Sequence, residues 1–440
     1  KNIRQIYFLI NVNMKDYFYD SVASEDRIRL NYIPTMPEFL EWIEKEYAEL
    51  PALSDMANTY TYKEMCHRVA RRRNFINGLG LKPGAHIAVM DKNSIHAMEM
   101  FLAITTSGHV AMMLPNALPE QAVTDCAARF DFDAVFFGED FKSQCSKVSC
   151  PAFPVTSMGE GQASMVQVDK ESACAIFFTG GTTGAPKGVV LSHRAIMRGS
   201  FNGCFMPGKV IGNQRYIAFL PLSHVFGMIR GFLSTLYTGS LEYSCEDMKS
   251  MIQKIPLIRP TCLVLVPGIT EILLGLVKMY GEKFLGGELK TIIAGAATVP
   301  PRQIAEYSKL GVRLLGGYGM TETGPRIAVP NGKTSFYSAG AVIDICEVRI
   351  QDGEIQVKSP SVMLGYYKNE EATKEVFTED GWFMTGDLGR LEEDGQLYVI
   401  GRKKNLIILS NGENVSPEGI EKKLMGNPAV EEVMVYGEGA

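Results

Sequence analysis

The sequence predicts an α/β protein with one large domain, built from two α/β subdomains and a smaller β subdomain, followed by the start of a second domain. Three observations lead to this prediction. Short apolar runs alternate with amphipathic helical stretches along most of the 440 residues. After about Ser338, short strands joined by Asp-Gly turns replace this alternation. The polar tripeptide from Arg402 to Lys404 then precedes one more strand and helix, as expected at a hinge.

The first elements fit this scheme. Residues 36–80 read as helical, and Thr61 with Glu64 forms a capping-box pattern before the second helix. Apolar runs then predict three strands around the helix at residues 97–106, and four buried strands further along. The expected strands cover residues 87–90, 110–114, 134–137, 216–220, 262–266, 291–294 and 312–315. Such alternation is typical of a mostly parallel sheet.

The later elements define the expected domain limits. Strands at 347–350, 354–357 and 397–400 predict a β-rich subdomain over about 338–402, inside a main domain of residues 36–402. Residues 1–35 form an N-terminal extension, and Met14 could be the natural start. Residues 403–440 are expected to begin an α+β C-terminal domain with a strand at 406–409 and a helix at 417–424. We expect that domain to be incomplete, because the chain stops at Ala440.

Composition excludes several classes of protein. Hydrophobic residues make up 46% of the chain and charged residues 21%, which are values of a globular protein rather than a disordered one. The net charge is −5 with no long basic run, so no nucleic-acid partner is expected. No apolar run is long enough to span a membrane, and we expect membrane contact to be peripheral at most. The nine cysteines lack any Cys-x-x-Cys pair, which favours a reduced, cytoplasmic protein.

The most informative stretch runs from Ile176 to Gly188, where an apolar strand enters a loop rich in glycine and threonine. Glycines allow backbone N–H groups to turn towards an anion, threonine hydroxyls add donors, and Lys187 adds a positive charge. Because Gly188 follows Lys187, the spacing is not that of a Walker A loop or a dinucleotide fingerprint. The stretch therefore predicts a polyphosphate cradle made by Thr179, Gly180, Gly181, Thr182, Thr183, Gly184 and Lys187.

Two later stretches add complementary chemistry. In the segment 316–323, Tyr318 could lay its ring against a base, Thr321 could donate to a phosphate oxygen, and Glu322 could hold Mg²⁺. Further on, Asp387 could accept hydrogen bonds from a ribose diol, with Arg402 as a donor on the other side. Each signal alone is weak, since a tyrosine beside glycine is common in cores and Thr-Gly-Asp is usually a turn.

Taken together in this order, the three stretches resemble the acyl-adenylate-forming (AMP-binding) superfamily. This superfamily includes acyl- and aryl-CoA synthetases, peptide-synthetase adenylation domains and beetle luciferases. The resemblance extends from about Tyr60 to Gly437, and the phosphate loop and the Arg-Lys-Lys hinge are most similar to those of fatty acyl-CoA synthetases. It implies that ATP and AMP are bound by Thr179, Gly180, Gly181, Thr182, Thr183, Gly184, Gly295, Ala296, Ala297, Gly317, Tyr318, Gly319, Met320, Thr321, Asp387 and Arg402.

The resemblance also implies roles for individual residues. The catalytic set would be Lys187, His224, Thr321 and Glu322, with Glu322 as the metal ligand. His224, in the substrate-side motif of residues 220–227, would lie beside the substrate carboxylate as a positioning group. His193, just after the loop, is expected to be structural. Two further positions would act in the second half-reaction, the domain hinge at Lys404 and the passage for the thiol at Gly412.

The implied reaction uses ATP, Mg²⁺ and coenzyme A to convert a carboxylic acid into a thioester. Residues 225–232 carry no acidic side chain that could pair with an amino group, so an acid without an amine is expected. We expect a medium- or long-chain fatty acid, with an aryl acid as the nearer rival. The acyl pocket would be formed by Phe226, Met228, Gly231, Val266, Pro267 and Gly316.

Two other functions stay open at this point. The first is an adenylation enzyme that loads an acyl-carrier protein instead of coenzyme A. The second is a nucleotide- or acyl-binding pseudoenzyme without a C-terminal lid. The superfamily's second catalytic lysine lies many residues past the hinge, and Lys422 and Lys423 are too close to the hinge to replace it. The chain ending at Ala440 is therefore expected to adenylate poorly.

Overall fold

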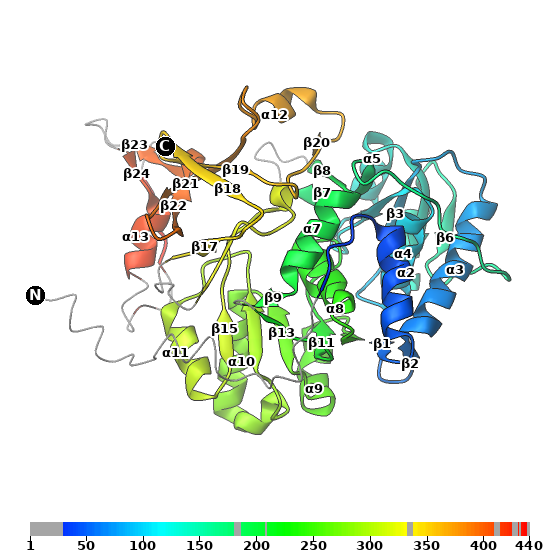
Figure 1. Ribbon diagram of the computed structural model, residues 1–440, viewed down its shortest axis with the longest axis horizontal. Coiled ribbons are helices and arrows are strands. Elements are labelled where there is room, and N and C mark those ends of the chain that lie inside the picture. Colours follow the sequence, from blue (N-terminus) through cyan, green and yellow to red (C-terminus); the bar gives the residue numbers. More distant parts are fainter. Residues whose placement is uncertain are drawn as a thin grey trace, which may run out of the picture.

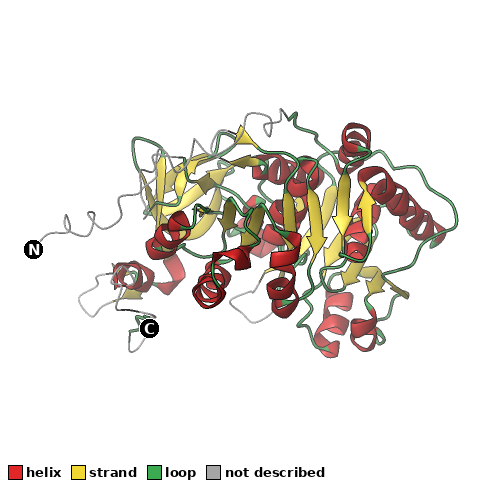
Figure 2. Cartoon of the chain, turned by 90° about the horizontal axis from the view of Figure 1, so that it is seen from below, coloured by secondary structure: helices red, strands yellow, loops and turns green. Residues whose placement is uncertain are grey.

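Figure 1 shows the computed structural model of the chain, in which helix-flanked β-sheets adjoin a helix-poor β subdomain. The structure describes residues 30–179, 186–206, 209–331, 338–408, 414–424, 430 and 433–437. The expected mixed α/β architecture is present. Figure 2 shows helices flanking the strands of the first of these sheets.

The first sheet has seven strands in the order β20-β8-β7-β4-β3-β5-β6. Strands β7, β4, β3, β5 and β6 run parallel, as the alternating pattern predicts. The strands are β3 His86–Met90, β4 Val110–Met113, β5 Phe132–Phe137, β6 Ala152–Pro154, β7 Ala173–Thr179, β8 Lys187–Ser192 and β20 Gly365–Tyr366. Its helical connections are α3 Tyr62–Gly78, α4 Ile95–Thr106, α5 Glu120–Arg129, η3 Glu139–Phe141 and α6 Lys142–Cys145.

The second group of strands forms two small sheets, β11-β12-β1-β2 and β13-β14-β15. The strands are β1 Pro51–Ser54, β2 Thr59–Thr61, β11 Arg215–Ala218, β12 Leu241–Ser244, β13 Cys262–Leu265, β14 Thr291–Ala294 and β15 Arg313–Leu315. The helices in this part of the chain are α7 His193–Gly203, the π-helical η4 Phe226–Leu233, α8 Ser234–Tyr237, α9 Met248–Ile258, α10 Pro267–Tyr280, η5 Glu282–Leu285 and α11 Pro301–Lys309. The short hairpin β9 Phe205–Met206 and β10 Lys209–Val210 follows α7.

The purely helical interpretation of residues 36–80 is wrong. Two strands, β1 and β2, separate α2 Met36–Tyr47 from α3, although the predicted capping box of Thr61 and Glu64 is confirmed. Strand β1 pairs in parallel with β12, where Leu53 faces Glu242. A four-residue strand that is stabilised by a partner so far along the chain leaves almost no local pattern in the sequence.

The expected β subdomain is a separate sheet of six strands in the order β16-β17-β22-β21-β19-β18. All its pairings are antiparallel. The strands are β16 Ala328–Val329, β17 Gly340–Val342, β18 Glu347–Gln351, β19 Glu354–Lys358, β21 Phe383–Leu391 and β22 Gln396–Arg402, and α12 is Glu370–Lys374. The Thr-Gly-Asp segment lies inside β21 rather than in a free turn, because β19 and β22 pair with β21 on both sides.

The C-terminal elements begin directly after β22. They are η7 Lys403–Asn405, β23 Ile407–Ile408, β24 Asn414–Val415 and α13 Pro417–Leu424. The helix has the predicted bounds, whereas β23 begins one residue after the start of the strand expected at 406–409, and residue 409 lies outside the described residues. The domain limits at 36 and 402 stay a prediction. None of the helices in the described part of the chain has the length and apolar character that crossing a bilayer requires.

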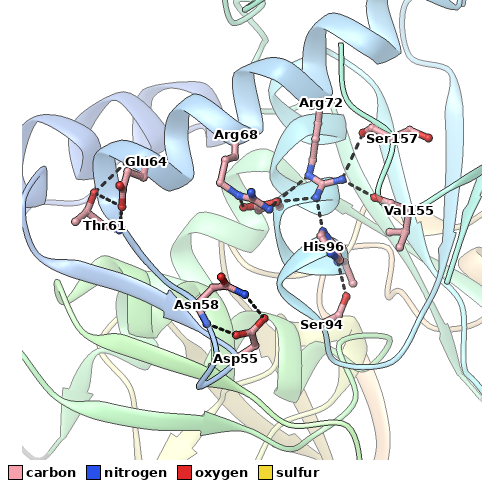
Figure 3. A network of polar contacts seen from close by, with 12 residues as sticks. Asp55, Asn58, Thr61, Glu64, Arg68, Arg72, Ser94, His96, Val155 and Ser157 are labelled. Atoms are coloured by element: carbon pink, nitrogen blue, oxygen red, sulfur yellow. Dashed lines mark hydrogen bonds and ion pairs between the residues drawn. The ribbon is translucent and has the colours of Figure 1, made fainter. Parts of the chain in front are cut away.

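A buried charge cluster ties α3 to α4. Figure 3 shows Arg68 and Arg72 on neighbouring turns of α3. Both guanidinium groups donate to the carboxylate of Glu99 in α4, with an Arg72 Nε to Oε2 distance of 2.9 Å. The side chains of Glu99 and Arg72 are fully buried, and Arg72 also donates to the carbonyl oxygen of Val155. The cluster therefore fixes the first helices on the first sheet.

Glu99→Ala is expected to destabilise the N-terminal part of the protein by about 3–5 kcal/mol, because Arg72 would keep a buried charge without its partner. The measurement is urea unfolding followed by circular dichroism. The control is Glu139→Ala, which removes an exposed ion pair with Lys142 and should cost less than about 1 kcal/mol. Equal effects of the two substitutions would contradict this role of Glu99.

A second buried contact joins α2 to α7. The Nδ1 atom of His193, the first residue of α7, accepts a hydrogen bond from the Met36 backbone N–H at 3.3 Å. Burial lowers the pKa of His193 to about 4, since a charged imidazole would lose its solvation there. This is the structural role that the sequence predicts for His193.

The sign of the pH dependence follows from this lowered pKa. The unfolded chain takes up the proton of His193 near pH 6.5, whereas the folded chain resists it down to about pH 4. The contribution of neutral His193 to the free energy of unfolding is therefore complete above pH 6.5. It is lost as the pH falls towards 4, by about 3 kcal/mol in total. His193→Asn keeps an acceptor without a titrating group, so its unfolding free energy should fall less over this range. An unchanged pH slope would contradict the assignment.

Candidate active site

The candidate site surrounds one cavity at the carboxyl ends of the parallel strands β14 and β15. Because these strands are in register, the segments that follow them meet at one edge of the sheet. The first segment contains Gly295 and Ala296, and the second contains residues 316–321. The cavity is lined by Gly199, Gly203, Phe205, His224, Val225, Phe226, Arg230, Ile293, Ala294, Gly295, Ala296, Leu315, Gly316, Gly317, Tyr318, Gly319, Met320, Thr321, Pro325, Arg326, Val329 and Pro330.

Close backbone approaches shape this cavity. A Cβ atom on Gly319 would lie 1.8 Å from the carbonyl oxygen of Pro325, so only glycine fits there. A Cβ atom on Gly295 would lie 2.7 Å from Cζ of Phe226, whose ring therefore rests directly on the turn after β14. The next residue, Ala296, has φ +64°, a left-handed conformation that is unusual for alanine. The loops at the ends of β14 and β15 are thus held tightly.

The residues expected on the nucleoside side form a triad around the buried carboxylate of Asp387. The Tyr318 hydroxyl donates to Asp387 Oδ2 at 2.6 Å, and Arg402 Nε lies 2.8 Å from Asp387 Oδ1. The pairing of β21 with β22 places Asp387 opposite Arg402. Burial raises the pKa of Asp387, and the hydrogen bond from Tyr318 and the charge of Arg402 oppose that shift. Three segments that are distant in sequence therefore present one carboxylate next to the Tyr318 wall of the cavity.

The expected phosphate side begins where β7 and β8 form a hairpin. Thr179 ends β7 and faces Lys187, the first residue of β8. The predicted loop positions Gly180, Gly181, Thr182, Thr183 and Gly184 lie outside the described residues. The hairpin nevertheless fixes both ends of that loop.

Tyr366, which sequence reasoning missed, joins Lys187 to Glu322. Its hydroxyl donates to Glu322 Oε1 at 2.9 Å, and the Lys187 Nζ lies 4.7 Å from the centroid of its ring. Pairing of β20 with β8 brings Tyr366 to this place, opposite Val189. Glu322 is 7% exposed, and burial, together with the nearby Glu322 carboxylate, raises the pKa of Tyr366. A tyrosine beside a glycine carries no sequence signal that could have identified it.

The pair Thr321 and Glu322 has the donor chemistry for the Mg²⁺ that the resemblance implies. Mg²⁺ in proteins commonly takes one or two carboxylates and completes its shell with water and substrate phosphates. A single carboxylate and a hydroxyl next to the phosphate side fit this pattern. The described residues contain no group of three His, Cys, Asp or Glu side chains that could hold a metal without such help.

His224 lines the cavity just before η4. Its Nδ1 accepts a hydrogen bond from the Phe226 backbone N–H at 3.3 Å, which orients the ring. Desolvation lowers the pKa of His224, so the neutral imidazole is the favoured form at neutral pH. The position is that of an orienting group at the cavity wall.

The predicted acyl pocket is only partly assembled. Phe226 and Gly316 line the cavity, and the other four residues do not. Met228 is fully buried in the main hydrophobic core, and Gly231 lies on the same buried helix. Pro267 is buried at the start of α10, and Val266 packs beside β13. η4 turns its middle residues into the core, which a linear motif does not reveal.

The remaining predicted site residues in the described part of the chain are not among the residues that line the cavity. Ala297 is exposed after the β14 turn and is not among the cavity-lining residues, and Lys404 is exposed in η7. Gly412 lies outside the described residues. Two cavity-lining residues that sequence reasoning missed are Arg230 in η4 and Arg326 after η6 (Thr321–Thr323).

Comparison with known proteins agrees with this geometry. The family model for AMP-binding enzymes matches residues 40–367. The 2-succinylbenzoate–CoA ligase of Bacillus cereus (strain AH820) is 27% identical over 420 residues, which cover 92% of this chain and 85% of that protein. The same ligase of Bacillus mycoides (strain KBAB4) is 28% identical over 418 residues, with the same coverage of 92% and 85%.

Solved structures show the same fold. O-succinylbenzoate coenzyme A synthetase (MenE) from Bacillus subtilis, in complex with AMP, has a TM-score of 0.81 at 24% identity, covering 92% of this chain and 86% of that chain. ATP-bound MatB from Rhodopseudomonas palustris has a TM-score of 0.79 at 24% identity, covering 90% and 84%. The same MenE has also been solved in complex with ATP and magnesium ion, with a TM-score of 0.78 at 25% identity, covering 90% and 85%.

The family model confirms the predicted superfamily, and the solved structures confirm the fold class. The prediction of ATP, Mg²⁺ and coenzyme A agrees with what the names of the relatives state. The two curated relatives are named for 2-succinylbenzoate rather than for a fatty acid.

Tyr366→Phe is expected to weaken MgATP binding about 10-fold or more, because Glu322 would lose a hydrogen bond to its charged form while the ring under Lys187 stays. The measurement is the dissociation constant by isothermal titration calorimetry, with and without Mg²⁺. Tyr367→Phe, which removes a surface hydroxyl contact with Asp131, is the matched control. If both variants bound MgATP like the parent protein, Tyr366 would not position Glu322.

Proposed function

Because the chain belongs to the AMP-binding enzyme family, we propose that it joins a carboxylic acid to coenzyme A at the expense of ATP, by way of an acyl adenylate. One observation carries the proposal. Tyr318 and Thr321 line one cavity. Next to Thr321, Glu322 and Lys187 both contact Tyr366. Next to Tyr318, Asp387 and Arg402 complete a triad. The first set has the chemistry for phosphates and a metal, and the second has the chemistry for a nucleoside.

In the first step, a carboxylate oxygen of the acid attacks the α-phosphorus of ATP, and the bond to pyrophosphate breaks. Two anions must approach each other, so positioning and charge neutralisation dominate the barrier. The Lys187 ammonium neutralises phosphate charge, and Thr321 donates to a phosphate oxygen. Bound Mg²⁺ would supply further neutralisation, held by Glu322, which Tyr366 orients. Asp387 and Arg402 keep the ribose in place.

In the second step, the thiolate of coenzyme A attacks the acyl carbon and AMP leaves with the bonding electrons. The neutral imidazole of His224 lies at the cavity wall, where it can orient the acyl carboxyl group. No protein nucleophile is needed, since the adenylate itself is the activated acyl donor. An acyl-carrier protein thiol is the alternative acceptor and would be distinguished by the product.

We favour an aryl or similarly compact acid over the fatty acid that the sequence suggests. The names of the curated relatives support this choice. The cavity also supports it, because four of the six positions expected to line a deep apolar channel lie elsewhere. For the location, the nine free cysteines support a reducing compartment such as the cytoplasm.

The test is acid-dependent ATP–pyrophosphate exchange by the longest natural form of the protein, with panels of aryl, fatty and amino acids. We expect exchange with aryl acids and transfer to coenzyme A when it is added. Exchange with fatty acids alone would instead identify a fatty acid as the substrate. A protein that binds MgATP but supports exchange with no acid would contradict the ligase proposal.

Asp387→Ala is expected to raise the dissociation constants of ATP and AMP alike, by about 10- to 100-fold, because both share the ribose. Glu322→Ala should weaken only the Mg²⁺-dependent part of ATP binding. The control is Asp380→Ala, since Asp380 pairs with Arg349 in the same subdomain away from the cavity. A change for ATP without a change for AMP would place Asp387 on the phosphates instead.

A further inference from the structure

Two arginines in the cavity wall have no role in the chemistry described above. Arg230 projects from η4 and is 6% exposed, and its Cδ packs against Gly203. Arg326 is half-buried and donates to the backbone carbonyl oxygens of Asn202 and Phe205, the latter at 3.0 Å. Arg326 thus has a structural role at the end of α7, whereas Arg230 has no hydrogen bond or ion pair among the described residues.

The charges of these arginines are not compensated. Neither guanidinium lies within 4.0 Å of a carboxylate oxygen in the described part of the chain. Burial, and then the nearby charge of Arg230, lower the pKa of Arg326 to about 9. Two cations that oppose each other in a cavity wall are unfavourable unless an anion lies between them.

The groups around Arg230 do not supply that anion. The titratable side chains that interact with it electrostatically are Cys204, Tyr216, Glu242, Cys262 and Arg326. Only Glu242 is acidic at neutral pH in water. It is 1% exposed, its Oε2 has no hydrogen-bond partner, and burial raises its pKa well above the usual range. Burial therefore favours the neutral acid, which leaves Arg230 without a counter-charge.

The two arginines line the same cavity as His224 and Thr321. One wall of the cavity carries His224 and, six residues later, Arg230. Another wall carries Thr321 and, five residues later, Arg326. One cavity therefore holds His224, which is suited to the reacting carboxyl, Thr321, which is suited to a phosphate, and two arginines suited to an anion elsewhere on the same molecule.

We propose that Arg230 and Arg326 form a subsite for a second carboxylate, so that the substrate is a dicarboxylic acid activated at one end only. This inference rests on the proposed function and names the substrate class for that site. A carboxylate accepts paired hydrogen bonds from a guanidinium, which gives the subsite both affinity and direction. An acid with an apolar end would leave the guanidinium desolvated and unpaired, and is rejected for that reason.

The test compares acids that differ only in the second carboxylate, with AMP present and binding measured by calorimetry. The pairs are 2-succinylbenzoate with 4-oxo-4-phenylbutanoate, pentanedioate with pentanoate, and hexanedioate with hexanoate. The variants are Arg230→Met, Arg230→Lys and, as the control, Arg302→Met, because Arg302 pairs with Glu271 on the surface of α11. MgATP binding is measured for each variant as the check on folding and on the nucleotide site.

We expect at least one diacid to bind about 30-fold or more tightly than its monoacid partner. Arg230→Met should bring that ratio close to one, because it weakens binding of the diacid and relieves the penalty on the monoacid, without changing the affinity for MgATP. Arg230→Lys should keep part of the ratio, and Arg302→Met should keep all of it. The proposal is overturned if no diacid binds better than its partner, or if Arg230→Met leaves the ratio unchanged. If the protein without substitutions did not bind MgATP, the proposed function itself would be contradicted.

Discussion

The hydrogen bond from the Tyr366 hydroxyl to Glu322 is the contact on which the candidate site depends most. It joins the edge of the first sheet to the segment that follows β15, and the Met363 backbone N–H reinforces it by donating to the Glu322 carbonyl oxygen at 2.8 Å. Because β20 pairs with β8, the same tyrosine also lies under the Lys187 ammonium. Tyr366 therefore holds the Lys187 ammonium and the Glu322 carboxylate in fixed positions relative to each other.

The rest of the site follows from the ends of parallel strands. β14 and β15 deliver their loops to one edge, and the antiparallel pairing of β21 with β22 brings Asp387 and Arg402 to the same region. Tyr318 and Arg402 both contact the buried carboxylate of Asp387 and favour its charged form, which accepts hydrogen bonds. The overall charge pattern also suits the proposed chemistry, since cations outnumber carboxylates around a cavity that would receive several anions.

The sequence predicted those parts of the fold and site that leave a local signature. The buried strands, the capping box at Thr61 and the helix at 417–424 each have a pattern of their own, and Lys187, Glu322 and Asp387 stand beside glycines and threonines that point to phosphate and ribose. In the structure, Asp387 contacts the cavity-lining Tyr318, and Lys187 and Glu322 meet at Tyr366, although the glycines of the phosphate loop lie outside the described residues.

The missed features depend on distant partners. Strand β1 exists because β12 pairs with it, and Tyr366 matters because β20 lies beside β8. Met228 was placed in the acyl pocket because it follows the substrate-side motif, yet η4 turns it into the core. The same helix exposes Arg230 to the cavity. Which side of such a helix faces a cavity is decided by tertiary packing and cannot be obtained from a linear motif.

The central claim is that nucleotide and acid occupy one continuous cavity. The most direct measurement is calorimetric binding of an adenosine N-acylsulfamate that carries the 2-succinylbenzoyl group, compared with AMP and with the free acid. The account predicts that the linked molecule binds at least about 100-fold more tightly than AMP, because both halves are held without a second loss of translational freedom. Binding no tighter than that of AMP would contradict the account.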